Sequence, residues 1–409
     1  MNFDLTTIQE GGLKFLINSV DKDSIPSKSM GVFYNRKMEI NRDITSLAIN
    51  AYNKTINQDP LIIVDSMAAS GISSIRILKE CNNIKKMYIN DINPYAVELI
   101  HKNLLLNELN NHPAEIEVSR KDSNFLFSEI GQNILNCTKY DLQKPNIISI
   151  DPFGTPNLYL DAAFKAIQRV NGLLCITATD TAVLFGVRPL SCIRKYMSKP
   201  LHTEYCKEIG ARILLYFISR IANINNLGII PLLTFYSSHF IRVYCLTFKN
   251  RKRIAEFFKD YRYFLHCNYC GYRTILSDNN IELSRNCPIC EKSGGINYAG
   301  PIWNNELHND DFLKKMIEIN SQYHYNNKNR IHKLLHIIKG EIGKPPFYYN
   351  IHKLSKVLKI SNTPKLDDII TRIKEKGYRV SRTHFDFISI KTNIDIISIK
   401  NILLQLGKN

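Results

Sequence analysis

The chain has 409 residues, of which 44% are hydrophobic, so it is long and apolar enough to form ordinary buried cores and favours two or more domains. Lys and Arg number 54 against 37 Asp and Glu, which gives a formal net charge of +17. Such an excess argues against an enzyme of small metabolites and favours a polyanionic partner. The N-terminus lacks the pattern of a secretory signal, and no apolar run reaches the roughly 18 residues that a membrane-spanning helix needs. We therefore expect a cytoplasmic protein with no membrane partner.

From Leu61 to Phe248, apolar runs typical of buried strands alternate with segments typical of helices. The expected strands are 61–65, 86–91, 114–118, 145–151 and 172–180. Strands that are apolar throughout belong to a parallel sheet that is covered on both faces. Two later runs, 229–237 and 240–249, lie so close together that they predict a hairpin. The pattern predicts a doubly wound α/β domain with an antiparallel edge.

The first strand is followed by the small-residue turn 66–71 (SMAASG), which lets a ligand approach the backbone at the carboxyl ends of the strands. Only Gly71 remains of the G-x-G-x-x-G pattern expected for a dinucleotide. Asp91, after the next strand, can accept both ribose hydroxyls, and Asp122-Ser123 after the third can hold an adenine amino group. Each acid alone could equally cap the following helix. S-adenosylmethionine has an adenosine and a cationic sulfonium but no phosphate, and is therefore the predicted cofactor.

The stretch Asp151-Pro152-Phe153-Gly154 follows the fourth strand. An exocyclic purine amine is a poor nucleophile because its lone pair is delocalised into the ring, and it gains positive charge as it attacks. A fixed carboxylate at Asp151 would accept hydrogen bonds from the amine and stabilise that charge, while Phe153 would stack on the base. We therefore predict Asp151 as a catalytic carboxylate. The competing interpretation is an ordinary Asp-Pro turn between a strand and a helix.

The chain contains the stretches VFYNRKMEINRDI, DSMAASGISSIRIL, YINDINPYAVELI, SIDPFGTPNLYLDAA, ITATDTAVLFG and SRTHFDFISIKTN. Together they resemble the tRNA (guanine 26-N2)-dimethyltransferases, in the compact form typical of archaea, over nearly the whole chain. The resemblance implies a class I methyltransferase fold and a C-terminal domain peculiar to the family. It also implies methylation of the N2 amine of guanine 26 in tRNA, giving N2-methyl- and N2,N2-dimethylguanine.

The same resemblance implies roles for single residues. The implied cofactor contacts are Arg42, Arg76, Asp91, Asp122 and Ser123, the catalytic acid is Asp151, and the aromatic residues flanking the target base are Phe33 and Phe153. An arginine fork suits the methionine carboxylate of the cofactor. The chain departs from the family at Arg36, where proline often follows asparagine, and at Ser123, where alanine is common. The first departure leaves the conformation of that loop open.

Four of the ten cysteines have the spacing Cys267-x2-Cys270-x16-Cys287-x2-Cys290. In a reducing compartment this spacing predicts a closed, structural zinc site with four thiolate ligands. Basic and aromatic residues nearby (YRYFLHCNYCGYR), and SRTH with Lys391 downstream, suit contacts with RNA phosphates and bases. A guanine in folded tRNA must be unstacked before its amine reaches Asp151.

We divide the chain into an N-terminal segment 1–55 with the loop that admits the base and the cofactor, a class I methyltransferase domain 56–250, and a zinc-containing, tRNA-binding α/β domain 251–409. We expect tRNA as the partner and no obligate protein partner. One alternative is methylation of another exocyclic amine, either adenine N6 or a glutamine amide. The other is a non-catalytic zinc protein that binds RNA through a vestigial cofactor fold. The cysteines, the charge and the C-terminal domain favour RNA over protein as the substrate.

Overall fold

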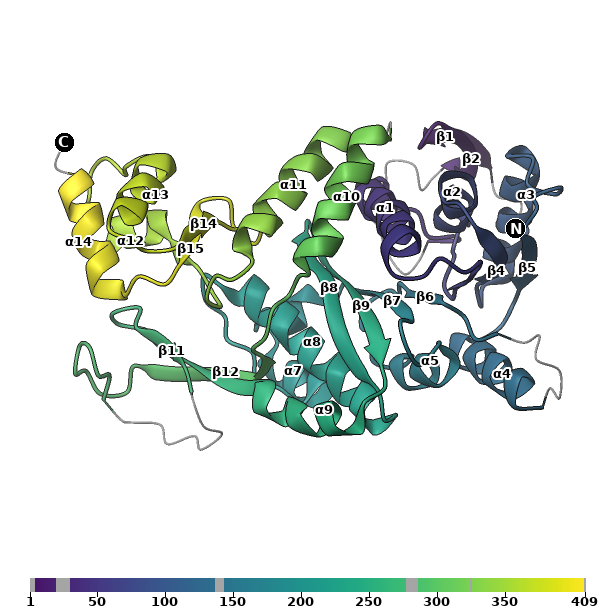
Figure 1. The fold of residues 1–409 in the computed structure, drawn as a ribbon. Helices are drawn as coiled ribbons and strands as arrows, with labels where there is room; N and C mark the ends of the chain where they lie inside the picture. The colour runs from purple at the N-terminus through teal and green to yellow at the C-terminus, as the bar shows by residue number, and fades with distance from the viewer. Residues whose placement is uncertain (1–3, 20–29, 137–142, 277–285, 324–325, 408–409) are drawn as a thin grey trace.

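A seven-stranded sheet with the order β5-β4-β3-β6-β7-β9-β8 forms the centre of the molecule (Figure 1). The computed structural model describes residues 4–19, 30–136, 143–276, 286–323 and 326–407. The strands are β3 (Leu61–Asp65), β4 (Ile84–Asn90), β5 (Glu115–Ser119), β6 (Ile147–Ile150), β7 (Leu173–Ala178), β8 (Gly228–Ser237) and β9 (Phe240–Phe248). The first five are parallel, and β8 and β9 form an antiparallel hairpin at the edge. The predicted doubly wound sheet is confirmed.

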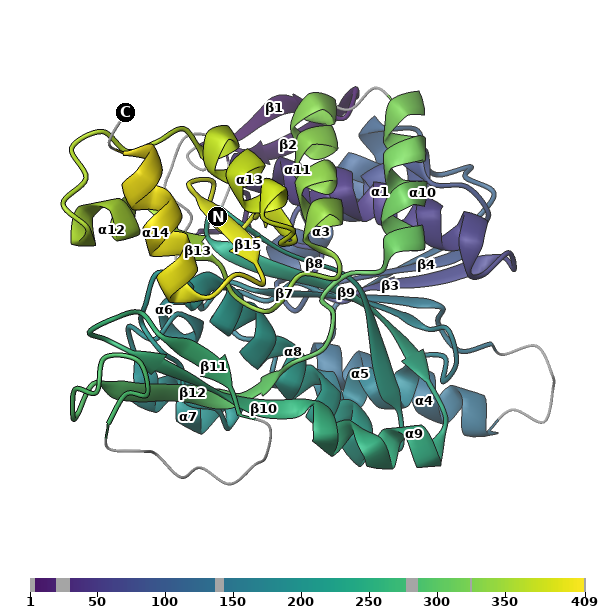
Figure 2. The ribbon, with the colours of Figure 1, turned by 60° about the vertical axis from the view of Figure 1, so that its left-hand side comes forward.

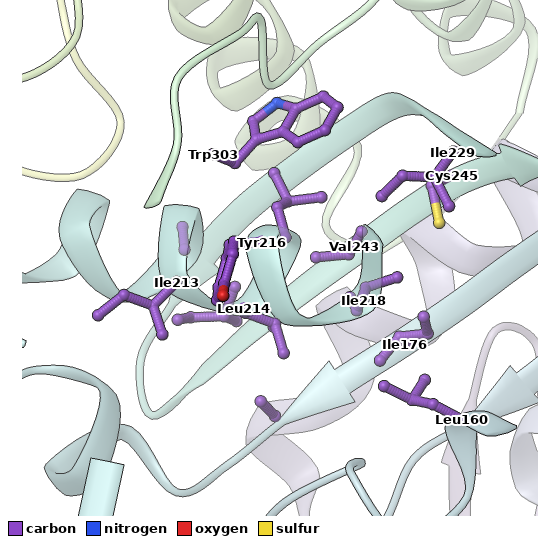
Figure 3. Packing of buried hydrophobic residues seen from close by; sticks show 14 of the residues in the cluster. Leu160, Ile176, Ile213, Leu214, Tyr216, Ile218, Ile229, Val243, Cys245 and Trp303 are labelled. Atoms are coloured by element: carbon purple, nitrogen blue, oxygen red, sulfur yellow. The ribbon is translucent and has the colours of Figure 1, made fainter. Parts of the chain in front are cut away.

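Helices cover both faces of the sheet, as Figure 2 shows. One face carries α1 (Glu39–Thr55), α2 (Ile72–Glu80), α3 (Pro94–Leu106), α10 (Asp310–Gln322) and α11 (Lys328–Glu341). The other carries α4 (Ser123–Asn136), α5 (Leu160–Ala166) and α8 (Cys206–Ile224), beside the shorter α6 (Thr181–Leu184), α7 (Pro189–Tyr196) and α9 (Arg251–Glu256). In Figure 3, apolar side chains of the strands pack against α8 and α5. Because both faces are buried, every residue of β3, β6 and β7 is buried too.

An N-terminal hairpin of β1 (Leu5–Glu10) and β2 (Leu13–Asn18) was not predicted. It packs beside α3, where the Asn103 side chain bonds both the backbone N–H and the carbonyl of Leu16. Asn103 Nδ2 also donates to the carbonyl of Ser70 at 2.9 Å. The hairpin is therefore held against the loop that follows β3.

Beyond residue 250 the chain forms two small sheets. The first consists of β10 (Tyr261–Cys267), β11 (Arg273–Ile275) and β12 (Ile296–Trp303), and packs on α8. The second consists of β13 (Tyr349–Asn350), β14 (Val380–Arg382) and β15 (Ser389–Thr392), which share a core with α12 (Ile351–Val357), α13 (Leu366–Glu375) and α14 (Ile396–Leu406). Because α10 and α11 share the core of the large sheet, the predicted boundary at 250 is not a boundary between cores. The division into 1–55, 56–250 and 251–409 stays a prediction.

Within the described ranges, no helix combines the length and the apolar character that crossing a membrane requires.

Candidate active site and cysteine cluster

The strands β3 and β6 are neighbours, and the chain leaves them toward opposite sides of the sheet. In sheets of this type, ligands bind beyond the carboxyl ends of the strands at such a switch point. The loops 66–71 and 151–154 follow these two strands. Gly71 has a φ of 77°, and a Cβ there would lie 2.9 Å from Ile100 Cγ1, so glycine is required in this turn. The structure therefore brings the two predicted loops together.

Two acidic side chains, those of Asp65 and Asp91, lie next to the loop 66–71. Asp91 accepts the backbone N–H of Ala69 at 2.8 Å and that of Asn93 at 2.9 Å. Burial raises the pKa of Asp91 although these N–H groups act in the opposite direction. Asp65 is fully enclosed and accepts the Ser74 hydroxyl at 2.6 Å. Burial, with a smaller contribution from the nearby Asp151 and Asp91, raises the pKa of Asp65 to about 6.

Asp151 lies at the end of β6 beside two aromatic rings. Its Oδ2 accepts a hydrogen bond from Asn41 Nδ2, on the first turn of α1, at 3.4 Å. The ring centroids of Phe33 and Phe153 are 5.7 Å apart with planes at 87°, and Phe153 is 50% exposed. Phe33, which lies far from Asp151 and Phe153 in sequence, thus meets the turn that carries them. Asn41 was not predicted.

The turn 151–154 and the loop 33–38 are each fixed by a polar side chain. The Thr179 hydroxyl accepts the N–H of Gly154 at 2.7 Å. Asn35 Oδ1 accepts the Lys37 N–H at 2.9 Å, which caps the short 3-10 helix Arg36–Met38. Asn35 Nδ2 donates to His239 Nε2 at 3.2 Å, in the turn between β8 and β9. The loop conformation that Arg36 left open is therefore set by Asn35. An asparagine at a helix N-cap can be recognised in the sequence, whereas nothing in the sequence indicated that His239 would contact this loop.

Arg42 and Arg76 are joined by a carboxylate that the sequence did not reveal. Arg42 Nε and Nη2 each donate to a Glu10 carboxylate oxygen at 2.6 Å. Arg76 donates to Glu10 at 2.9 Å, Glu80 at 2.7 Å and Asp43 at 2.5 Å. Burial alone would raise the pKa of Glu10, but the two guanidinium groups lower it. Arg76 is 0% exposed and Arg42 13%, so Arg42 is the one that reaches solvent. Their contact with a cofactor stays a prediction.

Asp122 and Ser123 lie where β5 leads into α4. The carboxylate of Asp122 accepts the N–H groups of Asn124 at 2.9 Å and Phe125 at 3.3 Å, so it caps the helix. The buried Ser123 hydroxyl donates to the carbonyl of Ser66 at 2.8 Å and ties α4 to the loop after β3. Both residues are next to the crevice. Their contact with an adenine stays a prediction.

Comparison with known proteins identifies the family of this chain. Residues 14–404 match the family described as N2,N2-dimethylguanosine tRNA methyltransferase. The chain belongs to this family. The resemblance predicted from the sequence is therefore confirmed.

Relatives of similar length support the membership. A protein of Methanosphaera stadtmanae, named tRNA (guanine(26)-N(2))-dimethyltransferase, is 34% identical over 99% of this chain and 98% of its own. A protein of Methanobrevibacter smithii with the same name is 35% identical over 100% of this chain and 99% of its own. Among solved structures, Trm1 from Pyrococcus horikoshii in complex with S-adenosyl-L-methionine matches with a TM-score of 0.81 and 29% identity, over 98% of this chain and 100% of that one.

The four cysteines of this methyltransferase family member converge at the end of β10. The Sγ atoms of Cys267 and Cys290 are 3.7 Å apart, and those of Cys270 and Cys287 are 3.6 Å apart. All four sulfur atoms lie within 4.8 Å of one another. Tetrahedral zinc with Zn–S bonds of about 2.3 Å places sulfur atoms about 3.8 Å apart, so the donor set fits this metal. The cluster was predicted correctly from spacing.

One predicted RNA contact is wrong. Lys391 is only 3% exposed, and its Nζ donates to Glu208 on α8 at 2.8 Å. It also lies 3.3 Å from Glu341 Oε2 at the end of α11, and His384 Nδ1 donates to Glu341 Oε1 at 2.6 Å. The THF and IKT segments of the C-terminal motif therefore join α8 and α11 to the small C-terminal core, and Lys391 does not face RNA.

Proposed function

We propose that the chain transfers methyl groups from S-adenosylmethionine to the N2 amine of guanine 26 in tRNA, with Asp151 as the catalytic carboxylate. The observation that carries the proposal is the meeting of Asp151 with Phe33 and Phe153 at the switch point of the sheet. The names of the relatives give the same base and position. The net charge of +17 suits a tRNA substrate.

The crevice fits the cofactor on two grounds. Asp91 is fixed by two backbone N–H groups and retains lone pairs on both oxygens for ribose hydroxyls. Asp91 and Asp151 lie close enough to Asp65 to raise its pKa, so three carboxylates gather at this edge of the sheet, which favours a positively charged sulfonium. When bound, the cofactor supplies an electrophilic methyl group. We assign the ribose contact to Asp91, the adenine contact to Asp122 and Ser123, and the carboxylate contact to Arg42 with Arg76 behind it.

Asp151 holds and polarises the target amine. The Asn41 hydrogen bond orients its carboxylate, which accepts an N–H of the amine and stabilises the positive charge that grows as the amine attacks. The proton that the methylated amine must lose to become neutral leaves through this N–H to the carboxylate of Asp151 and from there to solvent. Phe33 and Phe153 hold the unstacked base, and Pro152, which lacks an N–H, offers only a carbonyl acceptor. The amine has two hydrogens. One N–H therefore remains for Asp151 after the first transfer, which supports dimethylation.

The test is nucleoside mass spectrometry of a tRNA transcript incubated with the protein and S-adenosylmethionine. We expect N2-methylguanine followed by N2,N2-dimethylguanine, and neither with adenine at position 26. Asp151→Asn should slow single-turnover transfer by about 10²- to 10³-fold while both substrates still bind. Asp161→Asn, on the exposed face of α5, is the matched control and should not change the rate. A rate for Asp151→Asn within about threefold of the parent, under 1 kcal/mol of barrier, would contradict the mechanism. Methylated adenine would support the alternative substrate.

We also propose that the cysteine cluster holds one structural zinc ion. The support is the four converging sulfurs, with backbone N–H groups of Tyr272 and Ile289 donating to two of them at 3.4 Å. Cys287→Ser should lower zinc content and thermal stability together, because metal binding contributes to folding. Cys206→Ser, outside the cluster, should keep both. Retention of a full equivalent of zinc by Cys287→Ser would contradict the proposal.

A further inference from the structure

A groove of about 750 Å³ lies between α11 and the wall formed by β14 and the segment that follows it. Its basic and aromatic lining consists of His332, Lys333 and His336 on α11, and of Arg382 and Phe387 opposite. The imidazole Nε2 atoms of the two histidines are 3.1 Å apart, so both rings point to one place. Phe387 is 67% exposed. This groove shares no residue with the Asp151 site or with the cysteine cluster.

The exposed side of α11 is basic along its whole length. Its sequence, KNRIHKLLHIIKGE, contains four Lys or Arg residues, two histidines and a single acid. That acid, Glu341, is buried and bonds His384 and Lys391, so it does not offset the charge at the surface. On the opposite wall, Arg382 pairs with the exposed Asp367 at 2.8 Å. The groove therefore favours an anionic ligand.

The same helix connects the groove to the catalytic site. At its start, Asn326 donates to Glu39 and Asn327 to Asp43, each at 2.9 Å, near the amino end of α1. Asn41 of the same helix donates to Asp151. His336 lies nine residues after Asn327, or about 13 Å along a helix that rises about 1.5 Å per residue. The helix that forms one wall of the groove is therefore anchored on α1, the helix that also holds Asn41 against Asp151.

We propose that this groove binds the sugar-phosphate backbone of the substrate tRNA outside the target nucleotide. Lys333 and Arg382 contact phosphates, and Arg382 exchanges Asp367 for a phosphate oxygen. Phe387 stacks on an unpaired base, as exposed aromatic residues do on surfaces that bind RNA loops. The inference rests on the proposed function, because the occupant is the same tRNA. It names a second contact region that the methyl-transfer chemistry does not require.

The test measures tRNA affinity as a function of salt for Lys333→Glu and Phe387→Ala. The matched control is Lys85→Glu, an exposed lysine near the amino end of β4, at the sheet edge opposite the catalytic loops. Lys333→Glu should raise the Kd at least fivefold and reduce the slope of log Kd against log salt by about 1. Phe387→Ala should raise the Kd at least fivefold with an unchanged slope. Lys85→Glu should stay within twofold.

Two further readouts separate the possible failures. Cofactor affinity and the single-turnover rate at saturating tRNA should match the parent in all three variants, because none of these side chains touches the catalytic site. If the parent protein neither binds nor methylates tRNA, the proposed function fails. If the parent methylates tRNA but Lys333→Glu weakens binding no more than Lys85→Glu does, and Phe387→Ala binds like the parent, the groove assignment alone is overturned.

Discussion

Two groups of buried or half-buried carboxylates have pKa values that move in opposite directions. At the catalytic edge of the sheet, the pKa values of Asp65 and Asp91 are raised. At the junction of α8, α11 and the C-terminal core, those of Glu208 and Glu341 are lowered. Burial pushes all four upward, so the difference lies in the charges that surround each group.

The junction surrounds its acids with cations. Glu208 Oε1 accepts hydrogen bonds from Arg212 Nη2 at 2.9 Å and from Lys391 Nζ at 2.8 Å. Glu341 accepts a hydrogen bond from His384 Nδ1 and forms an ion pair with Lys391. At the catalytic edge, Asp65 accepts the Ser74 hydroxyl, and Arg242 lowers its pKa less than burial raises it, while Asp91 accepts backbone N–H groups. The contrast indicates that the junction completes its own charge balance as a structural element. The catalytic edge keeps negative charge for a cationic ligand, in line with the proposed function.

The largest expected effect is that of Glu341→Gln, which tests whether the acids of the junction are balanced by the cations around them. Removing one acid of this buried cluster leaves Lys391 with Glu208 as its remaining counter-charge and takes the charged acceptor from His384, which should lower the free energy of unfolding by about 3–5 kcal/mol at neutral pH. The folded pKa of Glu341 lies below its ordinary value of 4.5. Its contribution is therefore present above about pH 4.5 and is lost as the pH falls toward the folded pKa, so the two proteins should converge in acid.

Urea unfolding at several pH values checks this. Glu318→Gln, which removes an exposed acid of α10 paired with Lys315, is the matched control and should cost under about 1 kcal/mol. Equal stability of Glu341→Gln and the parent at neutral pH would mean that the junction does not act as a compensated cluster.

Asp65→Asn should raise the free energy of unfolding at neutral pH, in contrast to Glu341→Gln. The folded pKa of Asp65 is about 6 against an ordinary value of 3.8, so the folded state binds the proton more tightly than the unfolded chain does. Parent stability therefore falls as the pH rises from about 4 to about 6 and is level above. Near pH 7.5 the neutral variant should be more stable by up to about 3 kcal/mol, and the gain should vanish below about pH 4. Thermal unfolding across this range measures it. If Asp65→Asn is less stable than the parent at pH 7.5, the idea that the negative charge of Asp65 is uncompensated in the folded protein is wrong.

The sequence was informative about the catalytic edge because the evidence there is local. Apolar runs predict buried parallel strands, and Asp91 and Asp151 directly follow two of them, so their common location follows from the topology of a parallel sheet. The four cysteines are equally local, since their spacing alone defines the ligand set.

The junction and the arginine cluster could not be predicted in this way. Lys391 contacts Glu208, which lies 183 residues earlier, and Arg42 contacts Glu10 of a hairpin with no motif of its own. A basic residue in a polar stretch has the same local pattern whether it faces RNA or a buried acid. Only the tertiary contact distinguishes the two, which is why the prediction for Lys391 was wrong and Glu10 was not noticed.

Asp91 and Asp122 offer a finer comparison within the catalytic edge, because both accept backbone N–H groups but only Asp122 caps a helix with them. Asp91→Asn removes the charge that is proposed to accept the ribose hydroxyls. Cofactor affinity measured by calorimetry should fall by about 1.5–3 kcal/mol, since hydrogen bonds to charged groups contribute that much, while tRNA affinity should hardly change. Weaker tRNA binding with unchanged cofactor binding would refute this role for Asp91.

Asp122→Asn should have the smallest effect of the series. Asparagine caps a helix about as well as aspartate, so the bonds to the N–H groups of Asn124 and Phe125 survive and the free energy of unfolding should not change. If the adenine amino group also contacts this carboxylate, cofactor affinity should fall, but by less than in Asp91→Asn, because Asp122 would accept a single amino group and Asp91 would accept two ribose hydroxyls. Asp122→Ala removes the cap as well and should lower stability by about 0.5–2 kcal/mol. Asp122→Ala could lose cofactor affinity only because it is less stable. If it does so while Asp122→Asn keeps full cofactor affinity, this acid serves the helix alone. That outcome would leave Asp91 as the acid of the pair that binds the cofactor.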